Sequence, residues 1–333
     1  MYESARTILI LTVLLIVASA SAEDPLPSWN ESDAKQALLA FVEQVTDPSQ
    51  NTFVPEEDRL AVFDNDGTLW PECPMPFELA FTMDEAKRLA DTQPELARDP
   101  VIQAAINRDF ETLFAGEKHD GFLKLMALTH AGMSADEFQH RVTAWWETAK
   151  HPEYKERFRE LAYQPMREVI AYLRSHGFKI AIVSGGGMDF MRVFAEPLYG
   201  VEPEWVLGSS ADVTLEMKDG KPVVKKQSSG LSINDHEGKT KRIYNHLGRR
   251  PIAAFGNSDG DRSMMEYTTI DNPYPSFAMY IHHTDPDREY AYDSRPPFSG
   301  KLTTGLEAAK QHGWSVVDMK RDWNKVFSKP ITK

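Results

Sequence analysis

Two acidic residues follow an apolar stretch in the segment LAVFDNDGTLW, residues 60–70. Asp64 and Asp66 are separated by a single asparagine, so two like charges lie side by side at the end of an expected buried strand. Repulsion and loss of hydration both disfavour this arrangement unless a cation compensates it. Mg2+ suits such a place, because it takes one or two carboxylates together with phosphate oxygens of a substrate. The pair therefore predicts a Mg2+ site formed by Asp64 and Asp66.

The two acids can also divide the chemistry of phosphate-ester cleavage between them. Asp64 is ionised near pH 7 and can attack phosphorus without help from a separate base. Asp66 can protonate the departing alkoxide and then activate the water that hydrolyses the aspartyl-phosphate. Gly67 lets the chain turn sharply after the pair, and Thr68 can hydrogen-bond within that turn. We therefore predict Asp64 as the nucleophile and Asp66 as the general acid and base.

Two further segments offer groups that bind phosphate. In SGGG, residues 184–187, the hydroxyl of Ser184 and the amides of Gly185 and Gly186 can face a phosphate oxygen. An expected helix directly after these glycines adds its dipole to the same site. Lys239, in DHEGKTKRI, can neutralise the nonbridging oxygens. An ordinary tight turn and a solvated helix start are the alternative interpretations, and the occurrence of both segments in one chain favours phosphate binding.

The segment GNSDGD, residues 256–261, ends a third apolar stretch with polar residues. Asn257 and Asp261 are predicted to complete the Mg2+ shell, with Asp261 the preferred ligand. Asp259 is a weaker candidate, because the solubility of a loop explains at least one of these polar residues.

Strands and helices alternate along the chain, which predicts right-handed crossovers and a parallel sheet. Apolar runs before the three polar clusters are continuous, as expected for strands covered on both faces. Because ligands bind beyond the carboxyl ends of such strands, the three clusters should meet at one edge of the sheet. We predict an α/β fold with a doubly wound, Rossmann-like parallel sheet.

Two additions to this sheet are expected. Residues 77–161 have helical periodicity and few β-branched runs, which predicts an inserted helical cap, with residues 23–76 and 162–333 forming the hydrolase core. The segment ADVTLEMKDGKPVVKKQ alternates apolar and polar residues around Asp219 and Gly220, which predicts a small β-hairpin.

The N-terminus predicts export. Residues 1–22 contain Arg6, an apolar run over 8–17 and small residues at Ala20 and Ala22, the pattern of a cleaved signal peptide. We expect a periplasmic or secreted protein with no stable membrane anchor after cleavage. The net charge of −13 disfavours nucleic acid as a partner, and the single cysteine, Cys73, excludes an intramolecular disulfide.

The sequence supports a functional role less strongly for several other residues. IHHTDPD, residues 281–287, contains metal-binding residue types, but neighbouring side chains of an extended segment point to opposite faces. Trp70, Glu72 and Glu78 follow the first acidic pair where the chain enters the insert. They can contact a leaving group, although a proline-rich linker explains them nearly as well.

The ordered set FDNDGTLW, SGGG, a lysine before a helix and GNSDGD resembles the haloacid dehalogenase superfamily, especially its phosphoserine-phosphatase-like branch, over about residues 60–267. The resemblance implies that Asp64 is the nucleophile, Asp66 the acid and base, and Ser184 and Lys239 phosphate ligands. It also implies a Mg2+ site formed by Asp64, the backbone carbonyl of Asp66 and residues 257–261. The helical insert lies where such enzymes carry a cap.

One departure from the family pattern concerns the metal. Phosphoserine phosphatases usually carry aspartate where this chain has Asn257, so a neutral amide replaces a charged ligand. The acid at Asp66 nevertheless favours phosphate esters over the carbon–halogen bonds that dehalogenases attack. We expect a secreted, Mg2+-dependent phosphomonoesterase for small phosphorylated metabolites, with phosphoserine as the nearest family precedent. A non-catalytic phosphate-binding module and a phosphotransferase are the alternatives, and the sequence does not indicate an oligomeric state.

Overall fold

A six-stranded sheet forms the centre of the computed structural model, which describes residues 24–116, 119–293 and 300–331. All strand pairings in this sheet are parallel, in the order β3-β2-β1-β6-β7-β8. The strands are β1 (Leu60–Phe63), β2 (Lys179–Gly187), β3 (Val206–Ser209), β6 (Ala253–Gly256), β7 (Phe277–His282) and β8 (Ser315–Asp318). The order reverses at β1, which confirms the predicted doubly wound fold. The predicted signal peptide, residues 1–22, lies outside the described residues.

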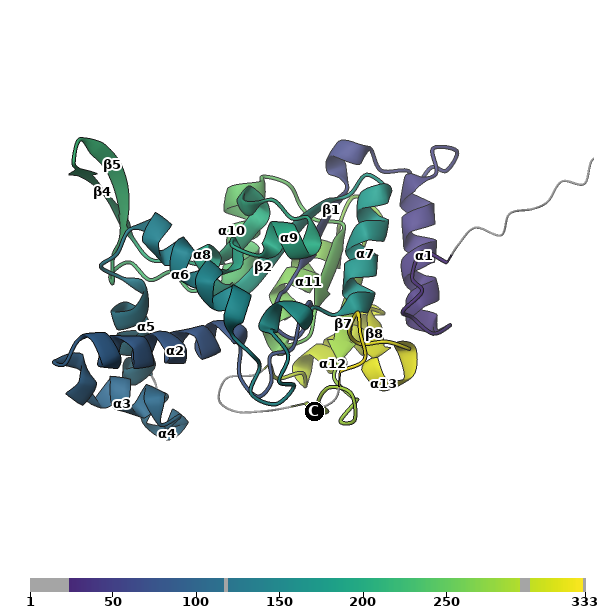
Figure 1. Ribbon diagram of the computed structural model, residues 1–333. Coiled ribbons are helices and arrows are strands. Elements are labelled where there is room, and N and C mark those ends of the chain that lie inside the picture. Colours follow the sequence, from purple (N-terminus) through teal and green to yellow (C-terminus); the bar gives the residue numbers. More distant parts are fainter. Residues whose placement is uncertain (1–23, 117–118, 294–299, 332–333) are drawn as a thin grey trace, which may run out of the picture.

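Helices cover both faces of the sheet, so alternate residues of one strand enter two different cores (Figure 1). Ala61 and Phe63 of β1 belong to one core, and Val62 belongs to the other. This double burial explains why the strand sequences are continuously apolar. The first face is covered by α1 (Asp33–Thr46), α7 (Gln164–Ser175), α8 (Met188–Met191), α9 (Ala195–Tyr199) and α13 (Met319–Asp322). The second is covered by α10 (Glu237–Leu247), α11 (Arg262–Thr269) and α12 (Thr304–His312).

An inserted helical domain connects β1 to α7, as predicted. It contains α2 (Phe77–Thr92), α3 (Pro100–Ile106), α4 (Phe110–Leu113), α5 (Asp120–His130) and α6 (Ala135–Thr148). Helices α2 to α5 share a separate core that includes Leu79, Ile102 and Leu113, and they project from the sheet in Figure 1. Phe138 and Val142 of α6 join the core of the sheet instead. Phe77 and Phe81 of α2 join the same core, so the cap is anchored through α6 and the start of α2, while its predicted boundaries, 77–161, stay a prediction.

A two-stranded hairpin extends from the body of the molecule (Figure 1). Strands β4 (Val213–Lys218) and β5 (Lys221–Lys226) pair antiparallel, as predicted. Asp219 and Gly220 both have positive φ, 54° and 76°, which is the geometry of a two-residue type I′ turn. The remaining short helices are η1 (Glu56–Asp58), η2 (Leu96–Arg98), η3 (Phe158–Glu160), η4 (Pro203–Trp205) and η5 (Asp259–Asp261). Within the described part of the chain, no helix combines the length and apolar character needed to cross a bilayer.

Candidate active site

Adjacent strands bring the three predicted clusters to one edge of the sheet. Strand β1 pairs with β2 on one side and with β6 on the other, and the sequences after or near their ends carry Asp64, Ser184 and Asn257. The backbone amide of Asp64 donates to Phe255 O at 2.9 Å, so the nucleophile candidate is fixed to the neighbouring strand. Parallel topology therefore assembles these residues from segments far apart in sequence.

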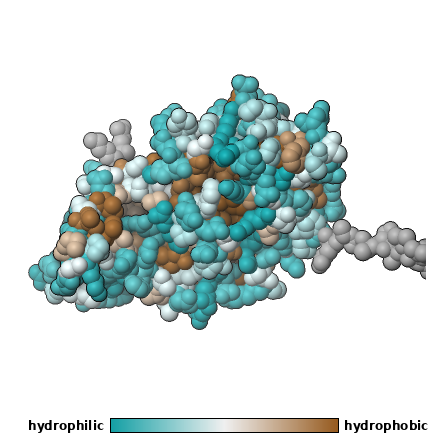
Figure 2. Space-filling view, turned by 90° about the horizontal axis from the view of Figure 1, so that it is seen from above, coloured by the Kyte–Doolittle hydropathy of each residue, from teal (hydrophilic) through white to brown (hydrophobic). Residues whose placement is uncertain are grey.

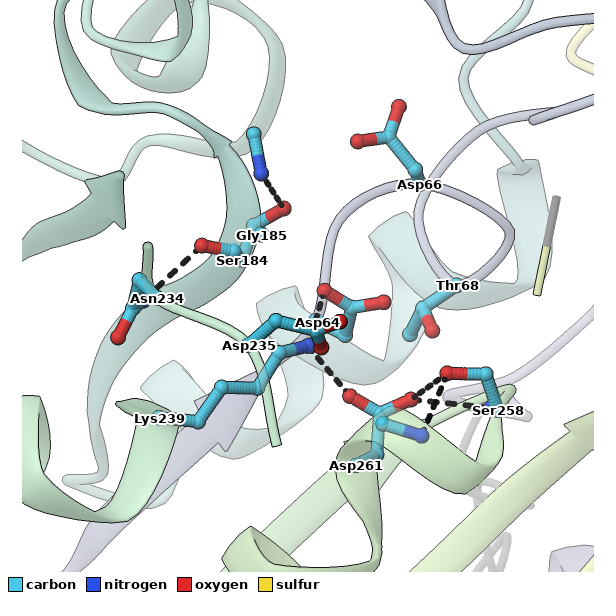
Figure 3. Close-up of polar contacts among 12 residues, drawn as sticks. Asp64, Asp66, Thr68, Ser184, Gly185, Asn234, Asp235, Lys239, Ser258 and Asp261 are labelled. Carbon is cyan, nitrogen blue, oxygen red and sulfur yellow. Dashed lines mark hydrogen bonds and ion pairs between the residues drawn. The ribbon is translucent and has the colours of Figure 1, made fainter. Parts of the chain in front are cut away.

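Lys239 joins two of the predicted residues directly. Its Nζ lies 2.7 Å from Asp64 Oδ1 and 2.5 Å from Asp261 Oδ1, and Figure 3 shows the three side chains converging. The lysine side chain is only 2% exposed. Burial alone would lower the pKa of Lys239, but the charges of Asp261 and Asp64 outweigh it and hold the pKa above its usual value. Lys239 is thus a permanent positive charge beside Asp64.

Burial has the opposite consequence for Asp64. It raises the pKa of this carboxyl well above its ordinary value, and the charge of Asp261 adds to the rise, while Lys239 opposes it. A further positive charge in the cleft would therefore stabilise the ionised nucleophile.

Both oxygens of the Asp261 carboxylate accept hydrogen bonds from protein donors. Its Oδ1 accepts from Lys239, and its Oδ2 accepts from the amides of Asn257 and Ser258 at 3.0 Å and from Ser258 Oγ at 3.2 Å. Gly256 permits this contact, because a Cβ there would lie 2.4 Å from Asp261 Cγ. In this geometry Asp261 orients the lysine and the loop after β6, and its role as a metal ligand stays a prediction.

Asp66 lies apart from the lysine pair, on the turn that follows β1 (Figure 3). Trp70 Nε1 donates to Asp66 Oδ1 at 2.7 Å. Burial raises the pKa of Asp66 to about 7; the Trp70 hydrogen bond opposes this shift, and the charges of Glu72 and Glu78 add to it. A carboxyl with this pKa can hold a proton near neutral pH and release it, as a general acid requires.

The turn after Asp66 is held from two sides. Gly67 has φ +76°, and a Cβ at this position would lie 2.0 Å from Asn257 Nδ2, so only glycine fits. His283 Nε2 donates to Gly67 O at 2.8 Å, and its Nδ1 lies 2.9 Å from Glu289 Oε2. Burial would lower the pKa of His283, but Glu289 outweighs it and raises the pKa, which favours an imidazolium that donates from both nitrogens. The IHHTDPD segment thus supports the acid–base turn through His283.

Ser184, Gly185 and Gly186 form an irregular segment of β2. The pairing of β2 with β3 shifts between Val183 and Gly187, which releases the intervening residues from the regular ladder. Ser184 is buried, and its Oγ accepts from Gly186 N at 3.1 Å (Figure 3). Helix α8 begins at Met188 as expected, but it has only four residues, so its dipole contributes little.

Sequence patterns did not identify every residue around this segment. Asn234 is fully buried, and its Nδ2 donates to Ser184 O at 2.9 Å and to Leu207 O at 3.1 Å, which fixes the carbonyl side of the bulge. Asp235 follows it and lines the same cleft. Asn234 and Asp235 precede Lys239 in the segment NDHEGK, and this closeness to a predicted phosphate ligand is the sequence feature that could have identified them.

Most of the predicted site residues line a single cleft. Its lining includes Asp64, Asp66, Ser184, Gly185, Lys239 and Asn257, whereas Asp261 lies behind Lys239 and is not among the lining residues. The opposite wall comes from the cap, with Glu78 and Leu79 of α2 and Phe122 and Met126 of α5. The cleft therefore lies between the sheet edge and the inserted helices, as a cap that contacts a substrate requires.

Glu72 was one of several weak candidates and proves to be the direct partner of Asn257. Asn257 Nδ2 donates to Glu72 Oε1 at 2.8 Å, while Thr68 Oγ1 donates to Asn257 Oδ1 at 3.2 Å. The hydroxyl of Tyr292 and the amide of Gly300 also donate to Glu72. A buried carboxylate thus lies next to the neutral amide of Asn257.

The oxygen donors suit a hard cation. Among residues 24–116, 119–293 and 300–331, no three acidic, histidine or cysteine side chains converge as a metal-binding group. Asp64, the carbonyl of Asp66 and Asn257 Oδ1 would instead provide a mixed set of oxygens, which Mg2+ accepts. Buried carboxylates at Asp64 and Glu72 create an excess of negative charge that such a cation would offset.

The fold and the cleft define a doubly wound α/β protein with an acidic pair after the first strand of its parallel sheet. The model of the haloacid dehalogenase-like hydrolase family matches residues 61–266, and the chain belongs to this family. No curated protein matches the sequence.

One solved structure shows the same fold at low sequence identity, and two others are similar over a smaller share of the chain. A conserved protein of unknown function from Anaerococcus prevotii DSM 20548 is 16% identical, with 93% of this chain and all of that chain covered and a TM-score of 0.56. A phosphoserine phosphohydrolase-like protein from Francisella tularensis subsp. tularensis SCHU S4 is 16% identical, with 67% and 87% covered and a TM-score of 0.38. Phosphoserine phosphatase from T. onnurineus is 17% identical, with 69% and 88% covered and a TM-score of 0.32.

Proposed function

We propose that this protein is a Mg2+-dependent phosphomonoesterase that acts through an aspartyl-phosphate at Asp64. The observation that carries the proposal is the contact of Lys239 Nζ with Asp64 Oδ1, 2.7 Å, in a cleft that also contains Asp66 and Ser184. A buried cation beside a nucleophilic carboxylate can bind the nonbridging oxygens of a phosphate and keep the carboxylate ionised.

The first half-reaction forms a bond between an Asp64 oxygen and phosphorus while the ester bond to the leaving oxygen breaks. Lys239, Ser184 Oγ and the backbone amide of Gly185 stabilise the charge on the nonbridging oxygens. Asp66 donates its proton to the leaving alkoxide, and its pKa of about 7 keeps that proton available near neutral pH. Bound Mg2+ would supply further positive charge to the nucleophile and the phosphoryl oxygens.

The second half-reaction regenerates the enzyme. Asp66, now ionised, takes a proton from a water molecule that attacks phosphorus, and the bond from phosphorus to Asp64 breaks. Inorganic phosphate leaves, Asp64 returns as a carboxylate, and Asp66 again carries a proton. Trp70 holds Asp66 in place through both steps by its indole hydrogen bond.

Assay of the purified mature protein with para-nitrophenyl phosphate, with and without EDTA, tests this function. We expect Mg2+-dependent release of phosphate that disappears in Asp64→Asn, while circular dichroism of that variant stays unchanged. Equal turnover by Asp64→Asn would exclude the mechanism.

A phosphate-binding module without turnover is the second candidate, and the neutral Asn257 favours it because a charged ligand is missing there. This candidate would be established if calorimetry shows that the protein binds phosphate and the assay shows no hydrolysis of para-nitrophenyl phosphate. Product analysis with excess glycerol would reveal a phosphotransferase, since glycerol phosphate would then accumulate.

We also propose export, with residues 1–22 removed and the mature protein in the periplasm or outside the cell. The apolar run and the small residues before Glu23 support this. Fractionation of the expressing cells followed by N-terminal sequencing should give a mature chain that starts at Glu23. A cytosolic protein that retains Met1 would contradict the proposal.

A further inference from the structure

A second cavity opens beside the catalytic cleft, under the cap. It has a volume of about 170 Å³ and shares Gly185, Glu78, Phe122, Met126 and Ile233 with that cleft. Gly185 belongs to the segment proposed to bind phosphate, so a group attached to the phosphate by its ester oxygen can enter this cavity.

Most of the cavity wall is apolar. Helix α5 contributes Phe122, Leu123 and Met126, and Phe138 and Phe190 close the inner end. Leu231 and Ile233 form an exposed part of the rim, 47% and 57% accessible. Figure 2 shows hydrophobic residues gathered in patches on the face of the molecule seen from above.

The charged residues that line this cavity in the described chain are already paired. Lys226 Nζ forms an ion pair with Asp189 Oδ2 and lies 4.6 Å from the centre of the Phe138 ring. Glu78 Oε2 accepts from Gly187 N at 2.6 Å, and its Oε1 lies 3.5 Å from His130 Nε2. A charged leaving group would have to compete with these contacts, whereas an apolar one would not.

We propose that the cavity binds an uncharged apolar group of the substrate alcohol, about the size of a benzene ring. This inference rests on the proposed phosphomonoesterase function and narrows its substrate class. An engineered protein cavity of about 150 Å³ with Leu, Ile and Phe walls binds benzene, which is a close match in size and chemistry. Phosphoserine, with a charged amino-acid group, is therefore a poor substrate.

Comparison of three alkyl phosphates tests the inference, because their alcohols leave with similar chemistry. Benzyl phosphate fills the cavity, phosphoserine presents charge to it, and methyl phosphate does not reach it. We expect kcat/KM for benzyl phosphate to exceed that for phosphoserine at least tenfold. The inference would be overturned if kcat/KM for phosphoserine equalled or exceeded kcat/KM for benzyl phosphate. No turnover of any of the three by protein that cleaves para-nitrophenyl phosphate would also overturn the inference, whereas no cleavage of para-nitrophenyl phosphate would reject the phosphomonoesterase function.

Two variants locate the effect in the cavity. Leu231→Ser makes the rim polar, and Ala127→Phe fills the cavity from α5. Both should lower kcat/KM for benzyl phosphate at least threefold and leave that for methyl phosphate unchanged. Val213→Ser is the matched control, because Val213 is 55% exposed on the hairpin and is not among the lining residues. An equal loss in Val213→Ser, or no loss in either cavity variant, would contradict the proposed site.

Discussion

Replacement of Asn257 by aspartate tests whether Glu72 provides the negative charge that the neutral amide lacks. The two side chains are 2% and 5% exposed, and they share a hydrogen bond of 2.8 Å. Asn257→Asp removes a hydrogen bond to a charged group, worth about 1.5–3 kcal/mol. It also places two carboxylates about 4 Å apart, where unscreened repulsion would approach about 4 kcal/mol at an effective dielectric constant of about 20. These two contributions sum to about 5.5–7 kcal/mol, but movement of the two side chains apart relieves part of the repulsion, so we expect the free energy of unfolding at pH 8 to fall by about 3–5 kcal/mol.

The free energy of unfolding lost in Asn257→Asp should be smaller at pH 5, because one of the two carboxyls, at position 72 or 257, then takes up a proton. A carboxyl whose pKa is raised in the folded state binds more protons than in the unfolded state, so stability falls as pH rises. Urea unfolding in EDTA, followed by tryptophan fluorescence at both pH values, measures the difference without bound metal.

The double variant Glu72→Gln/Asn257→Asp separates charge from shape. The glutamine amide that replaces the Glu72 carboxylate can donate to the new aspartate, so the double variant should be at least about 2 kcal/mol more stable than the sum of the two single effects predicts. Strict additivity, or a loss below about 1 kcal/mol in Asn257→Asp at pH 8, would refute the argument.

Three further predictions concern the acid–base turn and the lysine. Lys239→Met should lower the free energy of unfolding by about 3–5 kcal/mol, because Asp64 and Asp261 lose their shared cation; a loss below about 1 kcal/mol in urea melts would contradict the ion pairs. The pH profile of kcat/KM should fall as pH rises through about 7, where Asp66 loses the proton it donates, and Asp66→Asn should remove this limb. Gly67→Ala should cost about 1–3 kcal/mol from its positive φ alone, with added strain from the Asn257 contact; wild-type stability would show that the turn has a different conformation.

The sequence predicted the sheet and the edge at which the candidate residues meet, because both follow from local patterns. Continuous apolar runs identify parallel strands, and the topology of such sheets brings Asp64, Ser184 and Asn257 together without further information. The glycines at 185 and 186 were also visible in the sequence. SGGG alone fits an ordinary tight turn, and its occurrence with the other segments is what favoured a phosphate site.

Contacts between distant loops were not predictable in the same way. Glu72 reaches Asn257 across 185 positions of sequence, and nothing in the linker sequence indicates this pairing. His283, the residue directly after β7, donates to Gly67 O, so this contact depends on how β7 packs beside β6 and β1. Helical periodicity predicted that α6 would pack, but only tertiary structure shows that Trp146 stacks on Phe194 of the core.

The central claim, a phosphoryl group carried by Asp64, is tested most directly by trapping that group. Asp66→Asn lacks the base for hydrolysis of the intermediate, whereas para-nitrophenolate leaves without needing a proton from the acid. After rapid acid quench of this variant with para-nitrophenyl phosphate, peptide mass spectrometry should find one phosphoryl group on Asp64. A phosphoryl group on any other residue, or turnover without a nitrophenolate burst and without a phosphorylated peptide, would contradict the account.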